Sequence, residues 1–79
     1  EKTIGELAPE DLELLKVYFQ EDMSLQNTSS RLFLHKNSLQ YKLNRIGRLC
    51  GYNPRSFRQA AVLYMSLKLM ENEEDRKNR

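Results

Sequence analysis

Residues 34–51 read LHKNSLQYKLNRIGRLCG, and the spacing of the apolar residues in this stretch decides the fold. Four of them follow the i, i+4, i+7, i+11 pattern that places side chains on one face of an α-helix: Leu39, Leu43, Ile46 and Cys50. The pattern predicts a helix over residues 36–50. Gly51 follows at the position where a left-handed C-terminal cap is expected.

The opposite face of this predicted helix is polar and has no carboxylate. Four residues lie opposite the apolar stripe and two more flank them: Asn37, Tyr41, Asn44 and Arg48, with Gln40 and Arg45 beside them. Such side chains can donate hydrogen bonds to base edges or to phosphate oxygens. A face that is merely solvated usually mixes Glu with Lys, so the composition favours contact with nucleic acid.

A shorter helix is predicted immediately upstream. Ser24 is a suitable N-cap for a helix over residues 25–32, in which small Thr and Ser residues occupy the centre. The periodicity breaks at Phe33-Leu34-His35, which predicts a tight turn. Two helices joined in this way form a helix-turn-helix over about residues 24–51, a unit that places its second helix in the major groove of DNA.

Two further helices are predicted on either side of this unit. Pro9, followed by two carboxylates, is a typical helix start, and the apolar spacing after it predicts a helix over residues 9–21. Asn53-Pro54 predicts the start of a last helix that runs to about Glu71, and the charged tail over residues 72–79 is expected to fray.

Period-2 alternation, the signature of half-buried strands, does not occur. We therefore predict a single all-α domain over residues 1–79, a four-helix helix-turn-helix DNA-binding domain. We expect it to be a piece of a longer protein.

Charge is segregated along the chain. From Ser24 to Arg58 there is no acidic residue, whereas seven basic ones occur: Arg31, Lys36, Lys42, Arg45, Arg48, Arg55 and Arg58. Residues 1–23 sum to −5 and residues 59–79 to zero, so the net charge of +2 conceals a one-signed central block. A cluster of this kind suits closely spaced phosphates, which makes double-stranded DNA the expected partner.

A helical protein-interaction module, whose basic face docks an acidic partner domain, is the alternative interpretation. The salt dependence of binding distinguishes the two interpretations, because DNA binding weakens steeply and log-linearly with salt concentration, whereas a hydrophobic protein contact does not. Attachment to a membrane is disfavoured, since the polar helix face lacks Trp, Phe and Leu.

Composition also argues against catalysis and metal binding. The chain has one cysteine and one histidine, so it can form no internal disulfide and lacks a zinc ligand set. There is no glycine-rich phosphate loop, and no apolar run approaches the ~20 residues of a membrane span. We expect a non-enzymatic domain with no cofactor, no metal and no small-molecule ligand, located in the cytoplasm at the nucleoid.

Residues 34–46, followed by Leu49-Cys50-Gly51, resemble the signature of the C-terminal helix-turn-helix of PucR/CdaR-type bacterial transcription regulators. In that family a hydrophobic residue, His, a basic residue, Asn and Ser/Thr-Leu open the recognition helix, and a Tyr-basic-Leu step follows. The resemblance covers about residues 12–69. It implies a DNA-binding output domain at the C-terminus of a regulator whose upstream domains sense a metabolite.

Four candidate contacts lie at the start of the predicted recognition helix. We expect Asn37 to read a base edge or to contact a phosphate, and Lys36 and Ser38 to contact phosphate. Local capping is the alternative for these residues. For His35, the start of the helix and the family resemblance suggest an N-terminal cap or a phosphate contact.

The remaining candidates lie further along the helix. Tyr41 is expected to contact a phosphate or sugar, with packing on the preceding helix as the alternative. Gln40 and Asn44 stand where arginines are common in the family; they can bond adenine, or serve only as polar surface. Arg45 and Arg48 lie where the helix should leave the groove, which favours contact with backbone phosphates.

The last predicted helix carries two apolar stripes. The first is expected to close the core: Phe57, Ala60, Ala61, Tyr64 and Leu67. The second, formed by Val62, Met65 and Leu69, is expected to contribute to self-association, and the full-length regulator is expected to be a homodimer. The alternative is that both stripes are hidden within one monomer.

Overall fold

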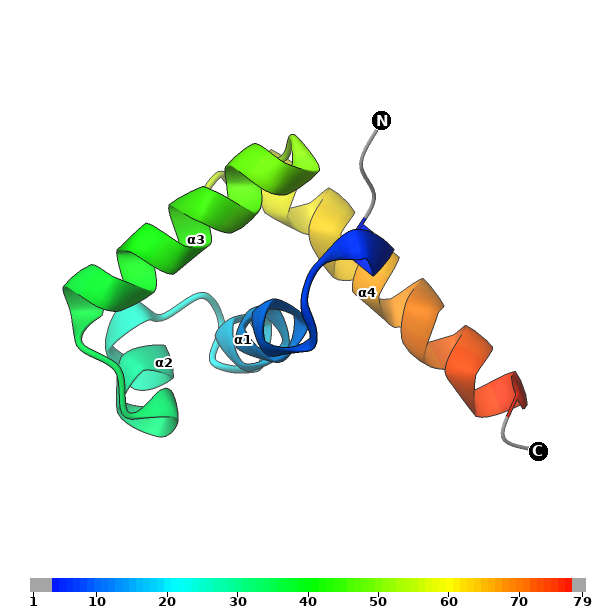
Figure 1. Ribbon diagram of the computed structural model, residues 1–79, viewed down its shortest axis with the longest axis horizontal. Coiled ribbons are helices and arrows are strands. Elements are labelled where there is room, and N and C mark those ends of the chain that lie inside the picture. Colours follow the sequence, from blue (N-terminus) through cyan, green and yellow to red (C-terminus); the bar gives the residue numbers. More distant parts are fainter. Residues whose placement is uncertain (1–3, 78–79) are drawn as a thin grey trace.

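The computed structural model describes residues 4–77, with side chains described for residues 4–73. In chain order the elements are η1 (Ile4–Glu6), α1 (Pro9–Gln20), α2 (Leu25–Leu32), α3 (Lys36–Cys50) and α4 (Phe57–Lys77). Only helices occur within the described residues, which confirms the all-α prediction (Figure 1). α3 lies along one edge of the molecule, α1 and α2 pack against its inner side, and α4 leads away toward the C-terminus.

Local capping sets the start of α2 and of α3, as the sequence predicts. The Ser24 hydroxyl accepts a hydrogen bond from the Asn27 amide at 3.1 Å, which satisfies one of the free amides at the start of α2. His35 Nδ1 accepts from the Asn37 amide at 3.1 Å and caps α3 in the same way. Both helices begin and end at the predicted residues, and α1 ends one residue before the predicted boundary.

The turn between α2 and α3 is built without glycine. Phe33 adopts a left-handed conformation with φ 57°, and the amides of Phe33 and Leu34 donate to the carbonyls of Ser30 and Ser29. These two bonds form the pattern that usually ends a helix at a glycine. An aromatic residue in this conformation costs about 1 kcal/mol, and the side chain of Phe33 is 95% exposed.

The core lies where α3 faces α1. The apolar stripe of α3 is buried as predicted, and Leu39, Leu43 and Ile46 have no exposed surface. Leu15 of α1 is equally buried at the centre of the same cluster. Ile4 and Leu7, in and just after η1, complete the core, although no helical periodicity marks them in the sequence.

The predicted start of the last helix is wrong. The Asn53 side-chain oxygen accepts from the Arg55 amide at 3.0 Å, and the Ser56 amide donates to the Asn53 carbonyl, so residues 53–56 form a turn. α4 begins at Phe57 and continues to Lys77, beyond the predicted end at Glu71. Pro54 is therefore not a helix-start residue; it is a buried loop residue.

The predicted core stripe of α4 is wrong in part. Ala60 and Leu67 are buried, but Phe57 is 81% exposed and Tyr64 is 45% exposed, and Ala61 is also exposed. Leu63, which was not assigned to the stripe, is buried instead. The reason is that α4 packs against both η1 and α1, so its buried face is turned toward Leu63 and Leu67.

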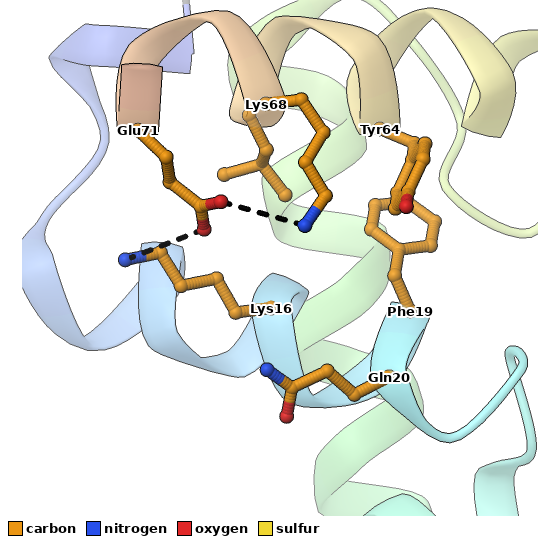
Figure 2. A pocket seen from close by; sticks show the side chains of 7 residues that line it. Lys16, Phe19, Gln20, Tyr64, Lys68 and Glu71 are labelled. Carbon is orange, nitrogen blue, oxygen red and sulfur yellow. Dashed lines mark hydrogen bonds and ion pairs between the residues drawn. The ribbon is translucent and has the colours of Figure 1, made fainter. Parts of the chain in front are cut away.

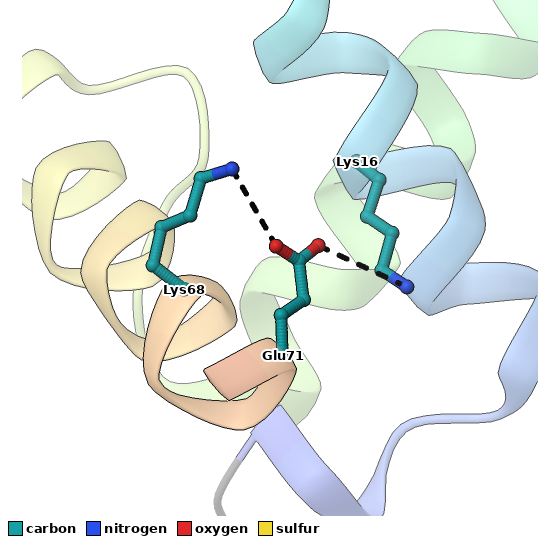
Figure 3. A network of polar contacts seen from close by, with 3 residues as sticks. All are labelled: Lys16, Lys68 and Glu71. Carbon is teal, nitrogen blue, oxygen red and sulfur yellow. Dashed lines mark hydrogen bonds and ion pairs between the residues drawn. The ribbon is translucent and has the colours of Figure 1, made fainter. Parts of the chain in front are cut away.

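One side of α4 is tied to α1 by aromatic and charged contacts. Phe19 and Tyr64 meet edge to face, with ring centroids 5.6 Å apart (Figure 2). Figure 3 shows Glu71 between two lysines, at 4.0 Å from Lys16 of α1 and 3.5 Å from Lys68 of α4. Ion pairs this exposed contribute little to the free energy of unfolding. The pair with Lys16 nevertheless shows that the face of α4 with Glu71 lies against α1.

Candidate nucleic-acid interface

The face of α3 that points away from the core is polar and accessible. Asn37, Tyr41, Asn44 and Arg48 are all exposed, and Tyr41 is 62% exposed. This exposure favours contact with an external partner over packing on α2. The outer edge of the molecule in Figure 1 is therefore formed by a helix with hydrogen-bonding side chains and no carboxylate.

The first turn of α3 combines a cap with free polar side chains. His35 is exposed and its Nδ1 is occupied by the Asn37 amide, which supports the predicted capping role. This leaves the side chains of Lys36, Asn37 and Ser38 exposed beside the positive end of the helix dipole. A helix start of this kind attracts anions such as phosphate.

Arg45 has a different environment from the other candidates. Its guanidinium donates to the Asp11 carboxylate at 2.8 Å, and Asp11 is only 4% exposed. The pair joins the side of α3 to α1, so the structure gives Arg45 a contact that the sequence analysis did not predict. A phosphate would have to compete with Asp11 for the Arg45 guanidinium, which favours a structural role for this residue. Gln40, on the other flank, is half-buried.

Two residues of the basic block form ion pairs with acidic residues of the same chain. Arg31 pairs with Glu21, directly after α1, at 3.0 Å, and Arg45 pairs with Asp11 of α1. Both arginines therefore bind carboxylates of the acidic N-terminal part of the chain. Five other basic residues make no ion pair with any described side chain: Lys36, Lys42, Arg48, Arg55 and Arg58. Cations without an internal partner can neutralise an external polyanion.

A shallow hollow extends the polar face beyond the C-terminal half of α3. It is lined by Asn44, Gly47, Arg48, Gly51, Asn53 and Gln59. The Asn53 amide donates to the Gln59 side-chain oxygen at 2.7 Å, which holds the loop against the start of α4. Sequence reasoning missed Asn53 and Gln59 as part of this surface, because their approach to α3 depends on the path of the loop.

Gly47 allows that loop to come close to α3. A Cβ atom at this position would lie 3.2 Å from Pro54 Cδ and 3.3 Å from the Tyr52 carbonyl oxygen. Either distance is tighter than ordinary van der Waals contact, so a larger residue would require the loop to shift by a few tenths of an ångström. The buried Pro54 therefore packs directly on α3.

The titratable groups behind α3 are structural. Burial raises the pKa of the Cys50 thiol above its ordinary value of 9.0, and the Asp11 carboxylate raises it further. Burial also raises the pKa of Tyr18, against a smaller opposing effect of the Arg55 charge. A buried thiol held in its neutral form is inert, which agrees with the predicted core role of Cys50.

This arrangement of α2, a three-residue turn and an exposed polar α3 defines the class of helix-turn-helix domains found in transcription regulators. Residues 11–69 match the family model described as the PucR C-terminal helix-turn-helix domain. The chain belongs to this family.

Two curated relatives support the assignment. The chain is 39% identical over 57 residues to the carbohydrate diacid regulator of Escherichia coli (strain K12), covering 72% of this chain and 15% of that protein. It is 29% identical over 66 residues to the proline-responsive transcriptional activator PutR of Bacillus subtilis (strain 168), covering 84% and 16%. The chain thus spans about a sixth of the length of these relatives, both of which are named as regulators and not as enzymes.

A solved structure shares the fold. The regulator of polyketide synthase expression from Bifidobacterium adolescentis superposes with a TM-score of 0.78 at 25% identity, covering 85% of this chain and 28% of that one. Separately, none of the helices within the described residues combines the length and apolar character needed to cross a membrane.

Proposed function

We propose that this domain binds double-stranded DNA sequence-specifically, with α3 in the major groove, as the output domain of a bacterial transcription regulator. The observation that supports this most is the exposed face of Asn37, Tyr41, Asn44 and Arg48, on a helix whose other face is fully buried. Membership of a family of regulator domains supports the same proposal. A regulator of this kind acts on the chromosome, which places it in the cytoplasm at the nucleoid.

Within this proposal the exposed residues have separate roles. Asn37, Asn44 and Gln40 face base edges, where amide side chains can recognise adenine with two hydrogen bonds. Lys36, Ser38 and Arg48 contact phosphates and set the position of the helix. Tyr41 donates its hydroxyl to a phosphate or sugar oxygen, and His35 caps the helix start.

Two copies of the domain read two half-sites in this proposal. Paired helix-turn-helix domains bind half-sites about 34 Å apart, which multiplies the specificity of one domain. The homodimer that this requires is formed by the full-length regulator, and the matched relatives have the additional length to contribute to it.

A salt series with duplex DNA tests the proposed function. We expect retardation of duplexes at low salt and a log–log salt slope of about −3 to −5, as ~0.9 per neutralised phosphate gives for four or five cations. Circular dichroism on the same sample verifies that the chain is helical. If the folded chain retarded no duplex at low salt, or if binding were insensitive to salt, DNA binding would be excluded in favour of a protein partner.

A further inference from the structure

The face of α4 that points away from the core is apolar. Met65 is two residues from both Leu63 and Leu67, which are buried, so it lies on the opposite side of the helix. Val62, Met65 and Leu69 are 43%, 65% and 64% exposed, and we call these three residues the outer stripe. The alternative that both stripes of this helix are hidden within one monomer is therefore wrong.

The outer stripe has the spacing of a helix–helix contact. Its members are three and four residues apart, so they form one continuous seam over two turns. Neither α1 nor η1 covers this seam, because the core contacts of α4 are made by Leu63 and Leu67 and its contacts with α1 by Tyr64 and Glu71, all on the other side of the helix. An exposed apolar patch bordered by charged residues is typical of a surface that meets another protein.

Charges at the two ends of the seam indicate the partner. Arg58 precedes Met65 by seven residues and Glu73 follows it by eight, and both are exposed. The seam is therefore nearly symmetric in position about Met65 and opposite in charge at its ends. A surface with this property is complementary to itself when a second copy is turned by a two-fold rotation.

We propose that α4 pairs with α4 of a second copy of this chain, antiparallel, with the two-fold axis close to Met65. Val62 then lies opposite the partner's Leu69, and Arg58 lies beside the partner's Glu73. A parallel pair would place Arg58 beside the partner's Arg58 and Glu73 beside the partner's Glu73. Both contacts would be repulsive, because they bring like charges together.

This interface extends the proposed two-copy mode of DNA binding, but its test contains no DNA. Failure of the pairing and failure of DNA binding are therefore separate results. A domain that bound DNA and stayed monomeric would overturn the interface alone.

Sedimentation equilibrium of the chain measures the pairing directly. We expect reversible, concentration-dependent association of the unsubstituted chain, and at least about tenfold weaker association of Met65→Glu, because two carboxylates would meet at the axis. Gln26→Glu is the control, because it adds the same charge at an exposed position of α2, away from the seam. This variant should associate like the unsubstituted chain. A folded, monomeric chain at high concentration, or equal weakening by both substitutions, would overturn the proposal.

Cysteine cross-linking tests the orientation. The natural Cys50 is buried, so the unsubstituted chain is the control and should not cross-link. Met65→Cys should form a disulfide dimer on mild oxidation. Val62→Cys alone should not, because seven residues at ~1.5 Å each separate the two cysteines by about 10 Å along an antiparallel pair, beyond the ~7 Å reach of a disulfide.

A mixture of Val62→Cys with Leu69→Cys should cross-link, and mass spectrometry identifies the mixed product. This result, together with no product from either variant alone, supports the antiparallel pair. Efficient cross-linking of each variant with itself and little mixed product would indicate a parallel pair and overturn the proposed orientation.

Discussion

Asn37 and Arg48 lie on the same exposed face of α3, but they are expected to contribute in different ways. Asn37 is in the first helical turn, next to the cap formed by His35, where a side chain reaches furthest into a groove. Arg48 is near the other end, beside the hollow that Asn53 and Gln59 line. One position is suited to reading a base and the other to neutralising a phosphate.

Asn37→Ala should relax preference at particular base pairs by about 1–3 kcal/mol, because a bidentate amide contact discriminates between bases. Arg48→Ala should weaken binding to all sequences alike and flatten the salt slope by about one. Binding-site selection followed by a salt series on both variants measures the difference. An unchanged base preference in Asn37→Ala would contradict the base-reading role.

Arg45 is expected to act on stability more than on DNA affinity. Arg45→Gln removes the charge that faces the buried Asp11 carboxylate and should lower the free energy of unfolding by about 1–3 kcal/mol. Arg48→Gln, on the exposed face, should change it by less than about 0.5 kcal/mol. Urea unfolding gives both values. Equal stability of the two variants would show that the pair with Asp11 contributes nothing.

Both ends of α3 are set by residues close to them in the sequence. His35 caps its start, and Gly51 ends it in a left-handed conformation with φ 83°. A Cβ atom at Gly51 would have open space around it, so only the backbone conformation requires glycine there. This is different from Gly47, where the approach of Pro54 sets the requirement.

Gly51→Ala should therefore destabilise the domain by about 1 kcal/mol through the left-handed conformation alone. Gly51→Asn should cost less, because asparagine tolerates this conformation better than other residues with a side chain. Thermal or urea unfolding of the two variants provides the comparison. If both substitutions had the same effect, the loss would not come from the backbone angle.

The domain as a whole buries two ionisable groups in its core, the thiol of Cys50 in α3 and the phenol of Tyr18 in α1. Burial raises the pKa of Cys50 above 9.0 and that of Tyr18 above 10.0. The folded state therefore holds these two protons more tightly than the unfolded state does. Their contribution to stability is complete below about pH 9 and is lost as the pH rises through the folded pKa values.

We therefore expect the free energy of unfolding to fall as the pH rises above about 9, and to fall less steeply in Cys50→Ala. Urea unfolding at several pH values measures the slope, which is informative even though the substitution also leaves a small cavity. The same slope in Cys50→Ala and in the unsubstituted chain would show that the thiol does not contribute.

The sequence by itself determined the elements that depend on near neighbours. Helical spacing, the Ser24 and His35 caps and the Gly51 conformation all involve residues within four positions of one another, so α2, α3 and the polar face of α3 could be predicted closely. The start of α4 was missed because Asn53 bonds within a turn, and a helix cap at Asn-Pro has the same local sequence.

Only the tertiary structure decided which surfaces meet. Arg45 pairs with Asp11, 34 positions away, and nothing local distinguishes it from the exposed Arg48. α4 has apolar residues on more than one side, so its buried face depended on Ile4 and Leu7 near η1 and on α1. Burial is a property of the packed molecule, because apolar area leaves water only where a distant segment covers it.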